Sequence, residues 1–292
     1  MPRSENKNMF KLKPVHLLGM PLNTLASISP RLGGALAFNL FGMPRTRKHR
    51  VEESHFLATA DLHFERIEGK RLALYHWGFR GPTVLLVHGW ESHAGRWRKV
   101  APALVQAGYQ VLALDAPAHG RSDGWHFTMI KYAEVLRTLL SRFGPIHTVV
   151  GHSVGGAASI WAMGQVDDAL RPEKAVILGS FSKLQSIMDQ TRKAIGANDN
   201  LIASFNSHVV RRFGKPVSHF AIDTMATKLG EVEALIIHDI KDRVTRSSES
   251  EILHAAWPSS KLLLTEGYGH GLTAPSVTQS LLEFILEKEV AV

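Results

Sequence analysis

Predominantly apolar runs recur from residue 61 to the C-terminus, and helical patterns separate most of them. The runs lie at residues 83–89, 110–115, 147–153, 174–180, 233–239 and 260–266, and they are typical of strands buried on both faces. A hairpin is predicted before them over residues 62–78, with its turn at Glu68-Gly69-Lys70. Strands that alternate with helices form a mostly parallel, doubly wound sheet. The sequence therefore predicts an α/β fold.

One interval, residues 181–232, breaks this alternation. It separates two predicted strands by about 50 residues and carries no strand pattern, but its apolar residues recur at helical intervals. Such an insertion is too long for a simple crossover, so we expect a small helical cap over the strand ends, where doubly wound sheets bind ligands. The α/β core would then comprise residues 61–180 and 233–292, with residues 1–60 forming a basic, helical N-terminal arm.

The net charge of +8 is concentrated at the start of the chain. Residues 1–50 contain nine Lys/Arg and one acid, whereas the other 242 residues contain 25 bases and 25 acids. A protein that grips phosphates should carry a basic stripe on its folded surface, so no nucleic-acid partner is expected. The chain has no cysteine, which excludes disulfides, thiolate zinc sites and cysteine nucleophiles.

The arm is apolar between residues 14 and 44, but it is interrupted by Pro21, Pro30, Arg31 and Pro44. No stretch of about 18 uninterrupted apolar residues remains, so a transmembrane helix is not expected. The same interruptions leave only a loose match to a signal peptide, carried by an Ala-Leu-Ala at 35–37 and by basic residues at the start: Lys7, Lys11 and Lys13. A cytoplasmic location is the default expectation.

Two interpretations of the arm remain. The favoured one is a pair of short helices packed on the domain, because segments broken by proline make poor amphipathic helices. The other is an interfacial anchor on anionic headgroups, with the basic residues that follow the apolar segment: Arg45, Arg47, Lys48 and Arg50. Peripheral membrane contact through residues 1–50 is therefore left open. The oligomeric state is not indicated by the sequence.

A serine stands at the apex of a predicted strand-to-helix turn, within Gly151-His152-Ser153-Val154-Gly155. Gly-x-Ser-x-Gly in this setting is typical of a nucleophile elbow, in which small neighbours let the strand and the helix approach closely. The turn lifts the hydroxyl above the sheet and directs the helix N-terminus at the reacting group. The motif alone is short, but a strand before it and a helix after it make a chance match a poor explanation.

A serine hydroxyl is a weak nucleophile and needs a base that a carboxylate orients. His270 follows the predicted strand at 260–266, and Asp242 follows the strand at 233–239. Asp239 is the rival acid, nearer the strand end, but Asp242 lies in the loop and has room to reach His270. The order serine, acid, histidine predicts a catalytic triad of Ser153, Asp242 and His270.

An oxyanion formed at the serine needs hydrogen-bond donors, which are commonly two backbone N–H groups. The N–H of Val154, directly after the nucleophile, is the first candidate. The second is the N–H of Trp90, after the strand at 83–87, where Gly89 lets the backbone come close. His88, His119 and His152 also lie in turns around this site, and structural hydrogen bonding is their default interpretation.

From residue 61 onward the chain resembles the α/β-hydrolase family. The resemblance rests on "VLLVHGW", "LDAPAHGRSDG", "VVGHSVGG", "IIHDIKDRV" and "GYGHG", which occur in family order. Ala118 replaces the first glycine of the commoner Asp-x-Pro-Gly-His-Gly-x-Ser, at a turn that we expect to tolerate it. Because position 153 is a serine, the resemblance argues against dehalogenase and epoxide-hydrolase chemistry, which uses a carboxylate nucleophile.

The function expected from these residues is hydrolysis of a small-molecule carboxylic ester or thioester through an acyl-enzyme. It needs no cofactor, and no His pair has metal-ligand spacing with carboxylates, so no metal is expected. One alternative keeps the triad for carbon–carbon bond hydrolysis, perhydrolysis or acyl transfer. A second alternative is a non-catalytic binding protein on a hydrolase scaffold, because fold does not fix function.

Overall fold

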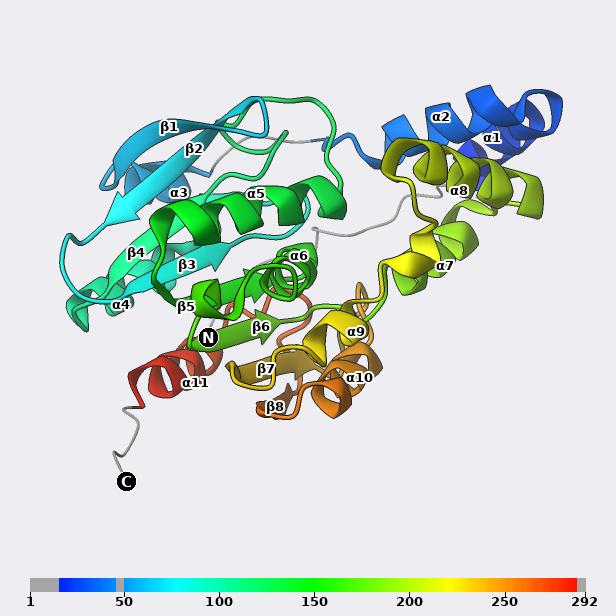
Figure 1. Ribbon diagram of the computed structural model, residues 1–292. Coiled ribbons are helices and arrows are strands. Elements are labelled where there is room, and N and C mark those ends of the chain that lie inside the picture. Colours follow the sequence, from blue (N-terminus) through cyan, green and yellow to red (C-terminus); the bar gives the residue numbers. More distant parts are fainter. Residues whose placement is uncertain (1–15, 46–49, 288–292) are drawn as a thin grey trace, which may run out of the picture. The chain divides into compact units, whose positions relative to one another are not determined.

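The computed structural model describes residues 16–45 and 50–287 and divides into two compact units (Figure 1). The helical unit comprises the described residues through Phe41 together with Gln185–His219. The sheet unit comprises Gly42–Leu184 and the described part of Phe220–Val292. Every predicted site residue belongs to the sheet unit.

The sheet unit contains eight strands in the order β1-β2-β4-β3-β5-β6-β7-β8. The hairpin of β1 (Asp61–Ile67) and β2 (Lys70–Trp77) is antiparallel, and β2 is also antiparallel to β4 (Gln110–Leu114). The other strands pair in parallel: β3 (Thr83–Val87), β5 (Ile146–His152), β6 (Lys174–Leu178), β7 (Glu233–Asp239) and β8 (Ser260–Thr265). The predicted mostly parallel sheet is confirmed, and the hairpin turns at Glu68 and Gly69, both with positive φ.

Alternate residues of the central strands point to opposite faces of the sheet, and each face is covered by helices. Val84, Val150 and Val176 belong to a core shared with side chains of the short helices α3 (Val51–Leu57), η1 (Ala94–Lys99) and α4 (Ala101–Gln106) and of α11 (Pro275–Leu286). Ile177 faces the other way, toward Gly156 of α6 (Val154–Met163). Helix α5 (Met129–Phe143) packs on α6. This layering buries the strands and leaves their carboxyl ends for the site.

The remaining short elements of the sheet unit connect these layers. They are η2 (Asp168–Leu170), α9 (Ile222–Ala226) and α10 (Ser247–Ala256), whereas η3 (Val217–His219) ends the helical unit. Helix α10 contacts β7 and β8. It therefore lies beside the strands whose following loops carry Asp242 and His270.

The helical unit combines the N-terminal arm with the middle of the predicted cap. Helices α1 (His16–Ile28) and α2 (Pro30–Phe41) pack with α8 (Asp199–Phe213), and α7 (Leu184–Ile195) precedes α8. A Cβ on Gly33 would lie 2.5 Å from Ala26 Cα, and one on Gly34 would lie 2.2 Å from Ser204 O. The glycine pair therefore lets α2 touch α1 and α8 closely, and Pro21 lies inside α1 without ending it.

The boundaries between these two units differ from the boundaries that the sequence predicts, which follow residues 60, 180 and 232. Residues 42–60, including α3, belong to the sheet unit, and so does α9 from the end of the predicted cap. The reason is that α1 and α2 bury their apolar faces against α8, which is remote in sequence. Placement of the cap over the strand ends stays a prediction. Among residues 16–45 and 50–287, no helix has both the length and the hydropathy to cross a bilayer.

Several basic residues of the arm named above have no described position: Lys7, Lys11, Lys13, Arg47 and Lys48. Two that are described bind acids of the sheet unit. The Arg45 guanidinium lies 2.7 Å from the Glu91 carboxylate, and the backbone N–H of Arg50 donates to Glu53. Both contacts therefore lie within the sheet unit and fix its first residues to it.

Candidate active site

Ser153 occupies a strained turn between β5 and α6. Its φ is 55° and its ψ is −127°, a backbone conformation that non-glycine residues rarely adopt. The Ser153 N–H donates to the carbonyl of Leu178 at 2.8 Å, and the Ser153 carbonyl accepts from Ser180 Oγ at 2.9 Å. Residues at and just after the end of β6 thus bind both the N–H and the carbonyl of Ser153 and keep the strained conformation in place.

The glycines around Ser153 are required by close backbone contacts. A Cβ on Gly155 would lie 2.4 Å from the carbonyl oxygen of His88, and a Cβ on Gly151 would lie 2.6 Å from Gly156 Cα. Real Cβ atoms do not approach backbone this closely, so a side chain at either position would force β5 and α6 apart. The geometry is that of the predicted nucleophile elbow.

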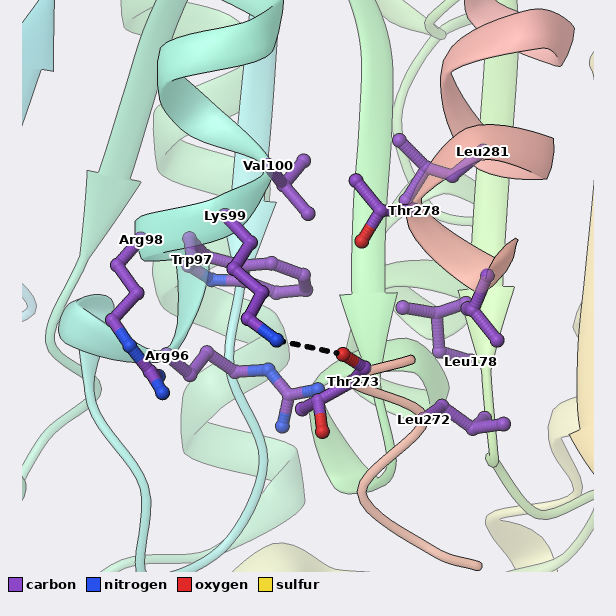
Figure 2. A pocket seen from close by; sticks show the side chains of 11 residues that line it. Arg96, Trp97, Arg98, Lys99, Val100, Leu178, Leu272, Thr273, Thr278 and Leu281 are labelled. Atoms are coloured by element: carbon purple, nitrogen blue, oxygen red, sulfur yellow. Dashed lines mark hydrogen bonds between the residues drawn. The ribbon is translucent and has the colours of Figure 1, made fainter. Parts of the chain in front are cut away.

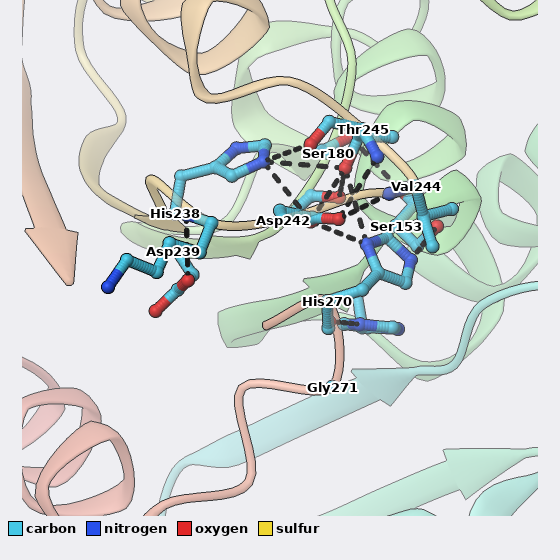
Figure 3. A network of polar contacts seen from close by, with 12 residues as sticks. Ser153, Ser180, His238, Asp239, Asp242, Val244, Thr245, His270 and Gly271 are labelled. Atoms are coloured by element: carbon cyan, nitrogen blue, oxygen red, sulfur yellow. Dashed lines mark hydrogen bonds and ion pairs between the residues drawn. The ribbon is translucent and has the colours of Figure 1, made fainter. Parts of the chain in front are cut away.

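The loops after β7 and β8 bring Asp242 and His270 to this turn. His270 Nε2 lies 3.0 Å from Ser153 Oγ, and His270 Nδ1 lies 2.7 Å from Asp242 Oδ2 (Figure 3). In the neutral imidazole that this arrangement accommodates, Nδ1–H donates to the carboxylate and Nε2 accepts from the hydroxyl. The structure therefore brings the three predicted residues into one hydrogen-bonded chain.

The rival carboxylate, Asp239, is engaged elsewhere. It accepts hydrogen bonds from the backbone of Tyr268 at 2.8 Å and Lys241 at 3.0 Å, and from Thr265 Oγ1 at 3.0 Å. Burial acts to raise the pKa of Asp239, but these hydrogen bonds outweigh it and hold that pKa below its usual value. Asp239 thus ties the loops after β7 and β8 together, and Asp242 is the acid that contacts His270.

The Asp242 carboxylate is fully buried and fully hydrogen-bonded. Oδ1 accepts from the backbone of Val244 at 2.7 Å and of Thr245 at 3.1 Å, and Oδ2 accepts from Thr245 Oγ1 at 3.0 Å. Burial acts to raise the pKa of Asp242, but hydrogen bonds from His238 and His270 outweigh it and hold that pKa well below its usual range. Asp242 therefore remains ionised and can stabilise a cationic imidazole beside it.

A second histidine, His238 on β7, also contacts this acid. Its Nε2 lies 3.3 Å from Asp242 Oδ2 and 3.1 Å from the carbonyl of Thr245, and its Nδ1 lies 2.6 Å from Ser250 Oγ. The ring is completely buried. Sequence reasoning missed His238, although it lies four residues before Asp242 in the same motif, because an inward strand position is by itself compatible with simple packing.

His152, the residue directly before Ser153, contacts both η1 and the loop that carries His270. Its Nδ1 lies 2.8 Å from Arg96 Nη1, and its Nε2 lies 2.8 Å from the backbone carbonyl of His270. Burial, followed by the charge of Arg96, lowers the pKa of His152 well below its usual value, so the ring is neutral. Because a guanidinium can only donate, Nδ1 accepts and Nε2–H donates to His270. This fixes the tautomer.

Arg96 on η1 supports the same loop directly. Its Nη2 donates to the carbonyl of Gly271 at 3.1 Å, while its Nε is buried and has no hydrogen-bond partner in the described chain. Burial lowers the pKa of Arg96 to about 9, which leaves it protonated at neutral pH. Arg96 and His152 therefore hold two successive carbonyls, those of His270 and Gly271. No sequence motif pointed to Arg96.

The predicted oxyanion donors both belong to segments beside Ser153, because Val154 follows it directly and Gly89 contacts it. A Cβ on Gly89 would lie 3.0 Å from Ser153 Cβ, which places the turn carrying Trp90 beside the nucleophile. Neither the Trp90 N–H nor the Val154 N–H donates to another residue of the described chain. His88 braces the turn, because Nδ1 donates to the Gly89 carbonyl at 2.7 Å and Nε2 accepts from Ala116. Both N–H groups are thus available to a ligand.

A small cavity lies behind the loop that follows His270 (Figure 2). Its walls come from η1, the end of β6, this loop and α11, and they include Arg96, Leu178, Leu272, Thr273 and Leu281. Ser153, Trp90 and Val154 do not line this cavity, so it is not the place where a substrate would meet the serine. Nowhere in the described chain are three or more His, Asp or Glu residues grouped so that they could hold a metal ion.

Comparison with known proteins adds three observations. The family model described as alpha/beta hydrolase fold matches residues 82–198. An uncharacterized protein of Mycobacterium tuberculosis is 33% identical over 117 residues, covering 39% of this chain and 34% of that protein. The chain thus matches about a third of the length of that relative. A monoacylglycerol lipase of Mycolicibacterium smegmatis is 26% identical over 207 residues, covering 59% of this chain and 74% of the lipase.

Solved structures share the fold. The bromoperoxidase from Bacillus anthracis superimposes with a TM-score of 0.59 at 21% identity, covering 78% of this chain and all of that chain. The family model over residues 82–198, the solved structures and the sheet agree with the resemblance seen in the sequence motifs, and the chain has the α/β-hydrolase fold.

Proposed function

We propose that this protein is a serine hydrolase that cleaves a carboxylic ester or thioester through an acyl-enzyme. The observation that carries the proposal is the hydrogen-bonded chain from Ser153 Oγ through both nitrogens of His270 to Asp242, at 3.0 and 2.7 Å. A hydroxyl at the apex of a strained turn, beside an imidazole that a buried carboxylate orients, is arranged for nucleophilic attack.

In this mechanism Ser153 Oγ attacks the substrate carbonyl while His270 Nε2 takes the hydroxyl proton. The negative oxygen that forms is held by the free N–H groups of Trp90 and Val154, each worth about 3 kcal/mol in comparable sites. His270 then gives its proton to the leaving alcohol or thiol, and an acyl-serine remains. Water, deprotonated by His270, attacks the acyl-serine and releases the acid. Asp242 stabilises the imidazolium in both steps.

The similarity to a monoacylglycerol lipase supports ester cleavage over the alternatives that use the same triad. The similarity to a bromoperoxidase keeps a peroxide acceptor in view, because attack of hydrogen peroxide on the same acyl-serine gives a peracid. These reactions share every step up to the acyl-enzyme. They differ only in which acceptor reaches the acyl carbonyl.

Labelling with a fluorophosphonate, followed by intact-mass spectrometry, tests the proposal. One adduct that maps to Ser153 is expected in the native protein, none in Ser153→Ala, and labelling at least a hundredfold slower in His270→Ala, because that variant lacks the base. Ser141→Ala is the matched control, since Ser141 is an exposed serine of α5 whose Oγ donates to the Arg137 carbonyl of the same helix.

Hydrolysis of p-nitrophenyl esters of increasing chain length then identifies the preferred acyl group, and added peroxide or alcohol identifies other acceptors. A folded native protein that takes up no label and cleaves none of these esters would contradict the proposal. In that case the non-catalytic binding protein becomes the better explanation. An adduct without ester turnover would instead direct the search to another bond or acceptor.

A further inference from the structure

The charge of the chain divides unequally between its two units. Residues 16–41 and 185–219, the described part of the helical unit, contain six Lys/Arg and two Asp/Glu, a balance of +4. The described part of the sheet unit, although much larger, contains 21 Lys/Arg and 22 Asp/Glu, a balance of −1. The sheet unit is thus nearly neutral, and the small helical unit is cationic.

The outer surface of α1 and α2 is apolar rather than charged. Residues 14–44 contain one charged residue, Arg31, whereas 21% of the whole chain is charged. One side of α2 is buried by packing, because Gly33, Gly34, Ala37 and Phe38 are all buried. The large apolar side chains that this packing leaves exposed are Met20 (73%), Ile28 (79%), Leu32 (62%), Leu36 (43%) and Leu40 (40%).

Three of these leucines form a stripe. Leu32, Leu36 and Leu40 recur at intervals of four residues along α2, so they lie on one side of the helix. An exposed helix of a water-soluble surface normally carries charged residues on that side. Here Arg31 is the only charged side chain of the two helices. The stripe therefore suits a partner that accepts apolar side chains.

We propose that the α1–α2 surface docks on an anionic phospholipid bilayer, with the leucine stripe inserted into the interface and the cationic helical unit held against the headgroups. An apolar helix face combined with basic charge is the chemistry that anionic lipid surfaces select. Each Lys or Arg close to such a surface strengthens binding about fivefold. A protein partner would not by itself account for the absence of acidic residues from residues 14–44.

The inference is independent of the proposed hydrolase activity, and its test uses vesicle binding as the readout. The full-length protein is mixed with vesicles of phosphatidylcholine alone or of phosphatidylcholine with phosphatidylglycerol, and the bound fraction is measured by co-sedimentation. Binding to the anionic vesicles is expected to be at least tenfold stronger, and to fall when salt is raised from about 0.1 M to about 1 M, which shortens the screening length from about 10 Å to 3 Å.

Variants distinguish binding through the leucine stripe from non-specific binding through any exposed apolar side chain. Leu32→Ser/Leu36→Ser/Leu40→Ser is expected to weaken binding to anionic vesicles at least tenfold, and Arg31→Glu to weaken it in low salt only. The matched control replaces three apolar residues of the sheet unit with similar exposure, Ile252 (41%), Leu264 (42%) and Leu286 (43%), by serine. This control is expected to bind vesicles like the native protein.

Circular dichroism establishes that each variant is folded. The proposal is overturned if the native protein binds neither vesicle, if it binds both equally, or if the stripe variant binds as tightly as its control. Sedimentation in the absence of lipid adds a further outcome. If the native chain is a dimer that the stripe variant dissociates, a second copy covers the stripe and the membrane proposal is wrong.

Discussion

Three histidines close to Ser153 differ in what their ring nitrogens contact. His270 lies between a hydroxyl and a carboxylate, so it can take a proton and return it. His152 lies between a guanidinium and a backbone carbonyl, so its proton is fixed on Nε2. His238 contacts Asp242 Oδ2, the same carboxylate oxygen that His270 contacts. Only the first of these environments permits general acid–base chemistry, and the other two position the loop and the acid.

The Arg96–His152 pair predicts a loss of turnover when its geometry is altered. Arg96→Lys keeps the charge, but one ammonium cannot replace the two separate donors that reach His152 and Gly271. The loop of His270 should shift slightly, and kcat for a p-nitrophenyl ester should fall roughly tenfold with KM little changed. Arg98→Lys is the control, because Arg98 is 3.9 Å from Glu53 and contacts no loop carbonyl.

A merely structural role for Arg96 would give a different result. In that case Arg96→Lys would lower the melting temperature and the amount of active protein, but the kcat per labelled serine would equal that of Arg98→Lys. Counting active sites with the fluorophosphonate makes this distinction. Equal kcat values in the two variants would therefore show that Arg96 does not position His270.

The turn between β3 and η1 depends on the small size of one residue. A Cβ on Gly89 would lie 2.9 Å from His152 Nδ1 and 3.0 Å from both the His152 carbonyl and Ser153 Cβ. Gly89→Ala should therefore move the Trp90 N–H away from the oxyanion position. Removing one such donor costs about a hundredfold in kcat. We expect a loss of that size in kcat/KM for ester cleavage.

Gly230→Ala is the matched control for this change. Gly230 belongs to the same unit, has ordinary backbone angles, and a Cβ there would meet nothing within 4 Å. Its ester hydrolysis should equal that of the native protein. If Gly89→Ala, shown by circular dichroism to be folded, also hydrolyses esters at the native rate, the Trp90 N–H is not an oxyanion donor.

Local patterns predict the strands and the elbow but not the choice of distant partners. The apolar runs at 83–89 and 174–180 became β3 and β6, since burial on both faces leaves few alternatives for such short runs. The same logic brings the residues after β5, β7 and β8 to one edge. In contrast, Gly33 and Gly34 look like helix breakers in sequence, and only the backbone of α8 explains them. The two-unit division and Arg96 were missed for this reason.

Two fully buried neutral histidines make the stability of the sheet unit depend on pH. Burial lowers the pKa of both His88 and His152 well below the ordinary value of about 6.5. Below that pH the unfolded chain binds their protons and the folded chain does not, so the stabilisation present above pH 6.5 is lost as the pH falls. The pKa of Asp242 is also lowered, but its contribution is lost only below about pH 4.

Between pH 6 and pH 4.5 the histidines should therefore dominate the slope. Each contributes up to about 1.4 kcal/mol per pH unit to the fall in the free energy of unfolding. Urea unfolding followed by tryptophan fluorescence measures this in the sheet unit alone, because all six tryptophans lie in it. His152→Gln should remove about half of the slope. A native slope near zero in this range would mean that the two rings are protonated in the folded protein, and that the neutral His152 tautomer assigned above is wrong.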